Sequence, residues 1–196
     1  MLSKTLNHNT KDRIMIIGIT GKLEAGKTTL AKEIQSHHKT GGVHILAFAK
    51  PLKDMCVNIF GFSYNDVYTT EGKTKYNGDW DMTPRVFMQK LGQGLRDAIG
   101  ADVWVKLLKK QILEKKDIYD IIIVDDCRYP EELNMIRSLG GITVRVIRPN
   151  HVAISGGLKN HPSEQDIPDD MLDYEFVNEG TIEDLWNNFH TLLPKV

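Results

Sequence analysis

The chain has 196 residues, of which 41% are hydrophobic, and its formal net charge at pH 7 is −1. This length fits a single domain with an apolar core, and the balanced charge gives no overall attraction to nucleic acid or to anionic membranes. No apolar run reaches the roughly 20 residues of a membrane-spanning helix, and residues 1–12 lack the apolar stretch of a signal peptide. The two cysteines, Cys56 and Cys127, form neither a disulfide framework nor a paired metal motif. We therefore expect a cytoplasmic protein that binds neither nucleic acid nor membranes.

Short apolar runs alternate with segments of helical periodicity along the chain. After a polar tail over 1–12, residues 13–20 (RIMIIGIT) form a nearly continuous apolar run, which is typical of a buried parallel strand. Alternation of strands with helices predicts an α/β fold, in one domain over 13–196, with a doubly wound sheet of five parallel strands. The other expected strands cover 41–49, 119–126, 142–147 and 174–178, and the expected helices of this alternation cover 27–38, 130–141 and 181–193.

Two connections are longer than a single crossover requires. Residues 49–118 contain three segments of helical periodicity, so we expect a helical insertion beside the sheet. Residues 149–172 carry glycine, proline, histidine and acidic residues without a period, which is typical of a lid-like or binding loop. His161 and Glu164 lie in this second connection without partners at metal-ligand spacing, which favours loop structure or substrate contact over a metal site.

The segment GKLEAGKT over 21–28 matches the phosphate-loop pattern G-x-x-x-x-G-K-[ST] at every fixed position, between an expected strand and an expected helix. Glycines let backbone N–H groups surround a phosphate, and the helix adds its positive N-terminal end. Lys27 is expected to reach the outer phosphates and Thr28 to hold Mg²⁺. An acid in such a loop repels anions, so we expect the Glu24 side chain to point outward. The residues expected to bind ATP here are Gly21, Lys22, Ala25, Gly26, Lys27, Thr28 and Thr29.

A second group of charged residues follows the expected strand 119–126, where the sequence reads IIIVDDCR. Ligands bind at the carboxyl ends of parallel strands, so a carboxylate from Asp125 or Asp126 can hold the hydration shell of Mg²⁺. Arg128 can neutralise charge on a transferring phosphoryl group. The alternative is a pair of caps for the next helix. Strand register decides which aspartate faces inward, and the sequence leaves that open.

Cations also gather in and after the expected insertion. Lys53 follows the second expected strand, and Arg85, Gln89 and Arg96 share one face of the helix expected over 83–100. Two arginines and an amide suit a phosphate and a base edge, although a solvated helix face would have the same composition. Arg148 ends the strand expected over 142–147, where it can act as a lid arginine. The chain has no Asn-Lys-x-Asp guanine motif, which favours phosphoryl transfer to a small acceptor over a GTP-binding switch.

Several motifs occur together in a fixed order, and the ordered set resembles the deoxynucleoside monophosphate kinases of tailed bacteriophages. The resemblance implies a three-layer P-loop kinase fold with a helical acceptor-binding insertion. It also implies ATP as phosphoryl donor, Mg²⁺, a deoxynucleoside monophosphate as acceptor, and action in a host cytoplasm. The motifs are the phosphate loop, PLKD (51–54), TPRVFMQKLGQGLRD (83–97), DVWV (102–105), VDDCRYPEE (124–132), VIRP (146–149), HPSE (161–164) and VNEGTIEDLW (177–186).

The resemblance also implies a role for individual residues. It matches Asp126 and Arg128 to the Asp-x-Arg motif of the family, which favours Asp126 as the magnesium partner of Thr28. It places Asn178 and Gly180 near the adenine of ATP. The expected catalytic residues are Lys27, Asp126, Arg128 and Arg148, and the expected acceptor-binding residues are Lys53, Arg85, Gln89 and Arg96.

Other functions stay open at this point. The same outline is similar to animal phosphomevalonate kinase and, more distantly, to dephospho-coenzyme A kinase, so the acceptor can be another small phosphorylated molecule. An ATP-binding module without catalytic turnover is a further alternative. Related enzymes include dimers, which leaves a homodimer open.

Overall fold

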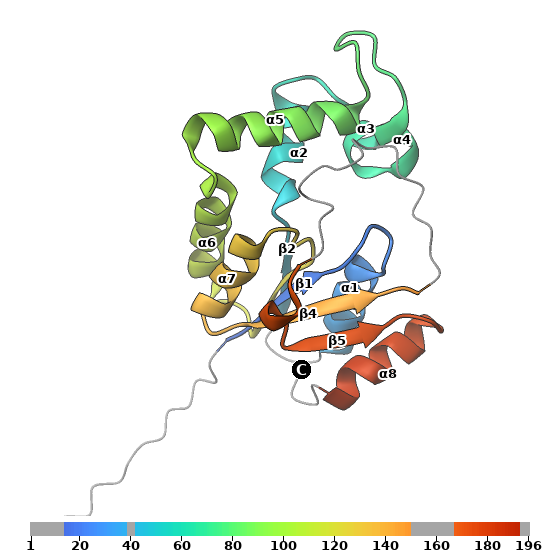
Figure 1. Ribbon diagram of the computed structural model, residues 1–196, viewed down its shortest axis with the longest axis vertical. Helices are drawn as coiled ribbons and strands as arrows, with labels where there is room; N and C mark the ends of the chain where they lie inside the picture. Colours follow the sequence, from blue (N-terminus) through green and yellow to red (C-terminus); the bar gives the residue numbers. More distant parts are fainter. Residues whose placement is uncertain (1–13, 39–41, 150–166, 193–196) are drawn as a thin grey trace, which may run out of the picture.

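The computed structural model describes residues 14–38, 42–149 and 167–192. In the described chain five parallel strands form one sheet in the order β2-β3-β1-β4-β5 (Figure 1). This sheet confirms the predicted α/β fold. The strands are β1 (Met15–Thr20), β2 (Val43–Leu46), β3 (Ile121–Val124), β4 (Ile142–Ile147) and β5 (Tyr174–Val177). The helices are α1 (Lys27–His37), α2 (Ala49–Asn58), α3 (Tyr64–Tyr68), α4 (Thr70–Thr74), α5 (Pro84–Ile99), α6 (Val103–Lys115), α7 (Pro130–Ser138) and α8 (Ile182–Leu192), with a short 3-10 helix η2 (Asp169–Met171).

Helices cover both faces of the sheet and give the three predicted layers (Figure 1). Successive residues of a strand point to opposite faces, so β1 sends Ile17 and Ile19 into one core and Ile16 into the other. The first core is completed by α1 and α8, and the second by α6 and α7. The central strands are buried on both sides, which explains why the sequence shows apolar runs there rather than alternation.

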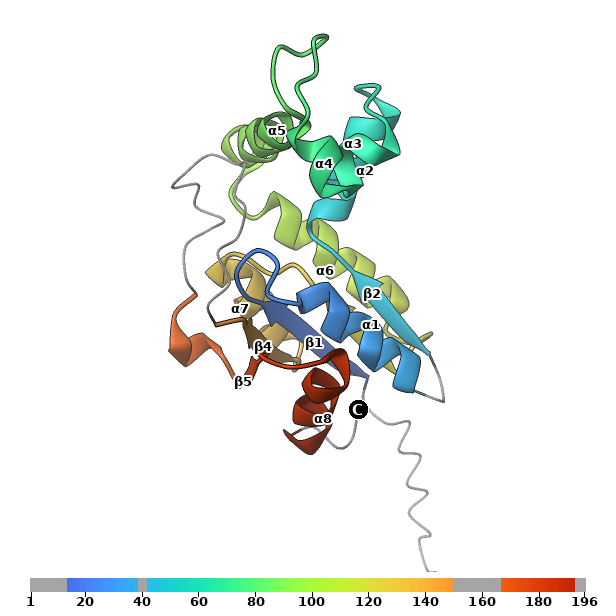
Figure 2. The ribbon, with the colours of Figure 1, turned by 90° about the vertical axis from the view of Figure 1, so that its right-hand side faces the viewer.

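The helices α2, α3, α4 and α5 lie together beyond one end of the sheet (Figure 2). They have a small core of their own, formed around the buried side chains of Cys56, Phe62 and Val67. Phe87 and Trp80 pack against it, and the Trp80 ring N–H donates to the carbonyl of Phe60 over 3.2 Å. The part of the predicted insertion that forms α2 to α5 therefore has an apolar core of its own, whereas α6 packs against the sheet.

The order of the strands determines where the functional residues meet. The chain leaves β1 through α1 toward β2, and it leaves β3 through α7 toward β4, on the other side of β1. Neighbouring strands whose connections run in opposite directions open a crevice at their carboxyl ends, where ligands bind in folds of this kind. The loop after β1 and the residues after β3 share this edge, below the insertion (Figure 2).

Two details differ from the predicted elements. The strand expected over 41–49 is shorter, because α2 already begins at Ala49. The short helices α3 and α4 were not predicted, since five residues are too few to show a period. Of the lid-like connection over 149–172, residues 150–166 lie outside the described chain, and with them His161 and Glu164. Across the described ranges, the helices are all too short or too polar to span a bilayer.

Candidate functional site

The loop between β1 and α1 has the backbone that a phosphate loop requires. Gly21 and Gly26 have φ values of 138° and 106°, which residues other than glycine rarely adopt. A Cβ on Gly21 would lie 2.3 Å from the carbonyl oxygen of Val146, and one on Gly26 would lie 2.5 Å from the side-chain nitrogen of Asn178. The exposed Glu24 also has a positive φ, 62°, which keeps an acid at the surface of the loop. Only glycine fits the two close approaches.

The side chain of Lys27 is hydrogen-bonded to the backbone of the phosphate loop. The Lys27 ammonium donates to the carbonyl oxygens of Gly21 and Lys22, each over 2.7 Å. The N-cap residue of α1 is Gly26, which has no side chain to cap the helix, so the first N–H groups of α1 remain directed to the loop. Backbone donors, a helix N-terminus and a lysine are the groups that bind a polyphosphate, so these residues fit the β- and γ-phosphates of a nucleotide.

The two aspartates after β3 have different partners. The Thr28 hydroxyl donates to the Asp125 carboxylate over 2.7 Å, and Asp125 is 8% exposed. Asp126 instead accepts from the backbone N–H groups of Phe48 and Ala49, over 2.7 and 2.9 Å, and so ties the start of α2 to the sheet edge. Burial raises the pKa of Asp126, while those N–H groups lower it. The family resemblance favoured Asp126 as the partner of Thr28, whereas in the structure the threonine hydroxyl is bonded to Asp125.

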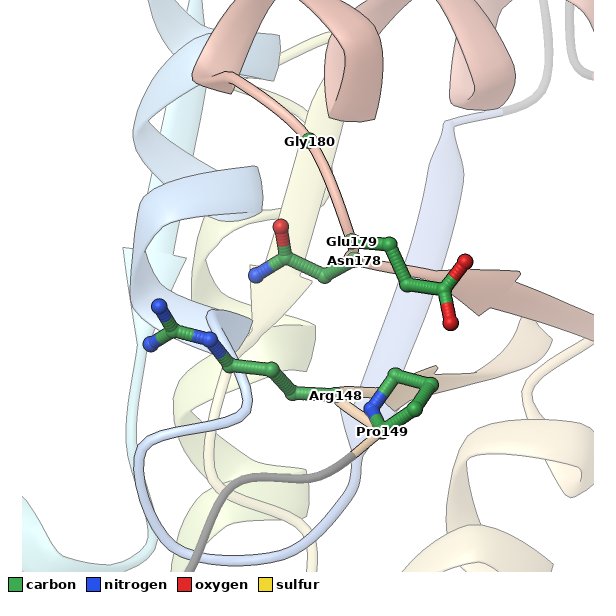
Figure 3. A pocket seen from close by; sticks show the side chains of 5 residues that line it. All are labelled: Arg148, Pro149, Asn178, Glu179 and Gly180. Carbon is green, nitrogen blue, oxygen red and sulfur yellow. The ribbon is translucent and has the colours of Figure 1, made fainter.

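A pocket of about 250 Å³ lies beside the phosphate loop, between the ends of β4 and β5 (Figure 3). Arg148 and Asn178 extend toward the loop in Figure 3, while Glu179 points away from it. The Arg148 guanidinium lies 3.5 Å from the carbonyl oxygen of Glu24, and the Asn178 amide donates to the carbonyl oxygen of Ala25 over 2.9 Å. Gly180 completes the lining. Arg148, which was predicted as a lid arginine, therefore lines the same pocket as Asn178 and Gly180, which were predicted to lie near the adenine.

The insertion also contributes a group of cations, namely Lys53, Lys73 and Arg85, here called the cation group, and Asp125 acts electrostatically on Lys53. Its members influence one another and Arg128 electrostatically. Burial lowers the pKa of Lys53, whose ammonium lies 4.6 Å above the centre of the Tyr68 ring. Burial and the neighbouring cations lower the pKa of Lys73 to about 8. Two members were predicted, but Lys73 was missed because it lies on the unpredicted helix α4.

Arg96 has protein partners of its own. Its guanidinium pairs with Glu131 over 2.9 Å and with Glu132 over 3.3 Å, and it lies 4.0 Å above the centre of the Tyr129 ring. Glu132 also accepts from the backbone N–H of Arg128 over 2.6 Å. This network holds the backbone at Arg128 and gives the Arg96 guanidinium two carboxylate partners within the protein. The half-buried Gln89 lies one helical turn beyond Arg85 on α5.

Arg96→Ala is expected to act on stability. It leaves Glu132, whose side chain is 3% exposed, as a buried carboxylate without its cation, which costs about 3 kcal/mol of unfolding free energy. Burial raises the pKa of Glu132 to about 8 with Arg96 in place, and loss of that cation raises it further, so at lower pH the lone carboxyl takes up a proton and the loss becomes smaller. Urea unfolding at about pH 9 and about pH 6 measures this difference.

Lys106→Ala is the matched control for Arg96→Ala. It removes an exposed ion pair with Asp102 on α6 and should change stability by less than about 1 kcal/mol. An Arg96→Ala variant as stable as this control at both pH values would contradict the structural role of Arg96.

Known proteins match this chain over most of its length. The profile of the family named deoxynucleotide monophosphate kinase matches residues 62–189. A protein of Acanthamoeba polyphaga mimivirus that carries this name provisionally is 28% identical over 189 residues, which are 89% of this chain and 93% of that protein. The deoxynucleotide monophosphate kinase of Enterobacteria phage T4 is 27% identical over 142 residues, which are 65% of this chain and 57% of the phage protein.

Two further matches are more limited. The deoxynucleoside-5'-monophosphate kinase of Escherichia phage T5 is 28% identical over 102 residues, which are 50% of this chain and 40% of that protein. A crystal structure of a sugar kinase from Janibacter sp. HTCC2649 aligns over 92% of this chain and 95% of its own, with 15% identity and a TM-score of 0.46. That distant likeness supports no conclusion about function. The family profile spans more than half of the chain, and the chain therefore belongs to the deoxynucleotide monophosphate kinase family.

Proposed function

We propose that this protein transfers the γ-phosphoryl group of ATP to the 5′-phosphate of a deoxynucleoside monophosphate. The observation that supports the proposal is that Asp125 accepts from Thr28 of the phosphate loop and also acts electrostatically on Lys53 of the cation group, on which Arg128 acts as well. The phosphate loop with Lys27 is then one anion-binding group, and the cation group from the insertion is the other. Two phosphorylated substrates need two such groups with a charged centre between them. Family membership supports the identity of the acceptor.

The donor side fits ATP with Mg²⁺. Backbone N–H groups of the loop and the Lys27 ammonium would hold the β- and γ-phosphates, and the pocket beside Arg148 and Asn178 would receive the nucleoside. Hydroxyl and carboxylate oxygens suit Mg²⁺, and Thr28 and Asp125 are hydrogen-bonded to each other at this point. We therefore assign the metal to Thr28 and Asp125 rather than to Asp126. A bound Mg²⁺ would neutralise phosphate charge.

The acceptor side follows from the cation group. Lys53 and Arg85 would hold the acceptor phosphate, with Gln89 near its base. An acceptor phosphate oxygen then attacks the γ-phosphorus, the bond to the β-phosphate oxygen breaks, and ADP leaves with those electrons. The attacking oxygen is already anionic near pH 7, so no general base is required. Arg128 and Lys27 would stabilise the charge that develops during transfer, with Arg148 contributing from the donor side.

ADP release tests this function directly. Purified protein is mixed with ATP, Mg²⁺ and one monophosphate at a time, in deoxy and ribo forms, with phosphomevalonate and dephospho-coenzyme A as further acceptors. One or more deoxynucleoside monophosphates should stimulate ADP release well above the rate with ATP alone. Stimulation by phosphomevalonate or dephospho-coenzyme A alone would reassign the acceptor, and ATP binding without any stimulation would indicate a module that does not turn over.

A further inference from the structure

The short helix α4 is held in place by two local interactions. The Thr69 hydroxyl accepts from the backbone N–H of Gly72 over 2.9 Å and caps the helix. A Cβ on Gly72 would lie 2.2 Å from the carbonyl oxygen of Asn65, so only glycine lets α4 pack this closely against α3. The next residue, Lys73, is half-buried rather than directed freely into solvent. Capping and close packing therefore fix the position of α4, which carries this lysine, within the insertion (Figure 2).

Lys73 is surrounded by positive charge from other elements. Lys53 on α2, Arg85 on α5 and Arg128 after β3 all repel its ammonium. Within the described chain, neither Lys73 nor Arg85 has an ion-pair partner, and the Nε atom of Arg85 is buried without a hydrogen-bond acceptor. Partly buried cations that repel one another are unfavourable unless an anion binds among them.

The carboxylates close to α4 have other roles. On α3, Asp66 accepts from the backbone N–H and the hydroxyl of Ser63, over 2.9 and 2.7 Å, and so caps that helix. Glu71 on α4 itself is exposed. Burial raises the pKa of Tyr68 on α3, so this phenol stays neutral near pH 8. None of these groups compensates the charge of Lys73.

We propose that Lys73 is a direct ligand of the acceptor's 5′-phosphate, acting together with Lys53 and Arg85. The proposal rests on the proposed function and gives Lys73, on α4, a direct contact with the phosphate beside those assigned above to Lys53 and Arg85. A phosphate dianion offers several acceptor oxygens, so cations from three helices can each donate to it. Its binding would replace repulsion within the cation group by attraction.

The proposal has a consequence for pH dependence. As pH rises through about 8, Lys73 of the free enzyme loses its proton, and the acceptor site loses one positive charge. The acceptor phosphate, with a second pKa near 6, is already a dianion there, so the substrate cannot cause the change. The kcat/KM for the acceptor should therefore fall above about pH 8. Arginine stays charged throughout this range, so Lys73→Arg should remove the fall.

Steady-state kinetics of four proteins test the proposal. Wild type, Lys73→Ala, Lys73→Arg and the control Lys75→Ala, which removes an exposed lysine just beyond α4, are compared with a deoxynucleoside monophosphate and ATP. Lys73→Ala should raise KM for the acceptor by about 10- to 100-fold, since a hydrogen bond to a charged group is lost. Its kcat and its KM for ATP should change by less than about threefold, as should every constant of Lys75→Ala.

The outcomes separate this proposal from the proposed function. No stimulation of ADP release by any deoxynucleoside monophosphate in the wild type would overturn the proposed function and this extension with it. An active wild type with an unchanged acceptor KM in Lys73→Ala would overturn the role of Lys73 alone. Thermal unfolding provides the folding control, because removing a repelled charge should leave Tm unchanged or raise it. A lower Tm together with equal increases in KM for the acceptor and for ATP would mark Lys73 as structural and contradict the proposal.

Discussion

Replacing Lys27 with alanine is expected to lower kcat by about 10²- to 10³-fold, the range found when one charge-stabilising donor is removed. The Lys27 ammonium is hydrogen-bonded over 2.7 Å to two carbonyl oxygens of the phosphate loop. From this position it can reach the outer phosphates of a bound nucleotide. In the variant, the negative charge on the transferred phosphoryl group would no longer be stabilised by the Lys27 ammonium. ADP release at saturating ATP and acceptor measures the loss.

Lys32→Ala is the control for this substitution. Lys32 is an exposed lysine on the same helix, and its replacement should leave kcat within about twofold of wild type. Calorimetric titration with ATP shows in parallel whether Lys27→Ala still binds the donor. Wild-type turnover by a folded Lys27→Ala variant would remove the loop lysine from the mechanism.

The second large effect is expected at Asp125. Because this carboxylate accepts from the Thr28 hydroxyl over 2.7 Å, Asp125→Asn removes charge beside the expected metal position. The concentration of Mg²⁺ needed for half-maximal activity should rise by about 10- to 100-fold, as is typical when an oriented metal-site carboxylate is replaced. Activity titrated with Mg²⁺ at fixed ATP measures this shift.

Asp126→Asn is the matched comparison. Asp126 accepts hydrogen bonds from the backbone N–H groups of Phe48 and Ala49. Its replacement should weaken these bonds at the start of α2 and so lower the stability of the protein. Its Mg²⁺ requirement should stay closer to that of wild type. If Asp126→Asn alone shifted the Mg²⁺ requirement, the metal would belong to Asp126, as the family motif first indicated.

Much of the fold could be predicted because its signals are local. The apolar run of β1, the glycine pattern of the phosphate loop and the periodicity of α1 lie next to one another in the chain. The helix expected over 83–100 is α5, which begins at Pro84 after the N-cap Thr83. The helices α3 and α4 escaped prediction. They depend on caps at Ser63 and Thr69 and on the close approach at Gly72, which show no period.

The arrangement of the candidate site was only partly predictable, because its contacts join residues far apart in the sequence. Asp126 is bound by backbone N–H groups 77 and 78 residues away, which leaves Asp125 for Thr28. Arg96 shares a helical face with Arg85, as predicted, yet its ion pairs lie 35 and 36 residues further along the chain. The spacing of residues shows which side chains share one face of a helix, but not which side chains of other elements contact that face.

The central claim concerns the atom that receives the phosphoryl group, so the most direct measurement follows that group. ATP labelled at the γ-phosphate is incubated with the protein, Mg²⁺ and a deoxynucleoside monophosphate, and the products are separated. We predict that the label appears in the deoxynucleoside diphosphate, and that Lys27→Ala reduces it by about 10²-fold or more. Label found only in inorganic phosphate, or retained entirely in ATP with every deoxynucleotide tested, would contradict the account.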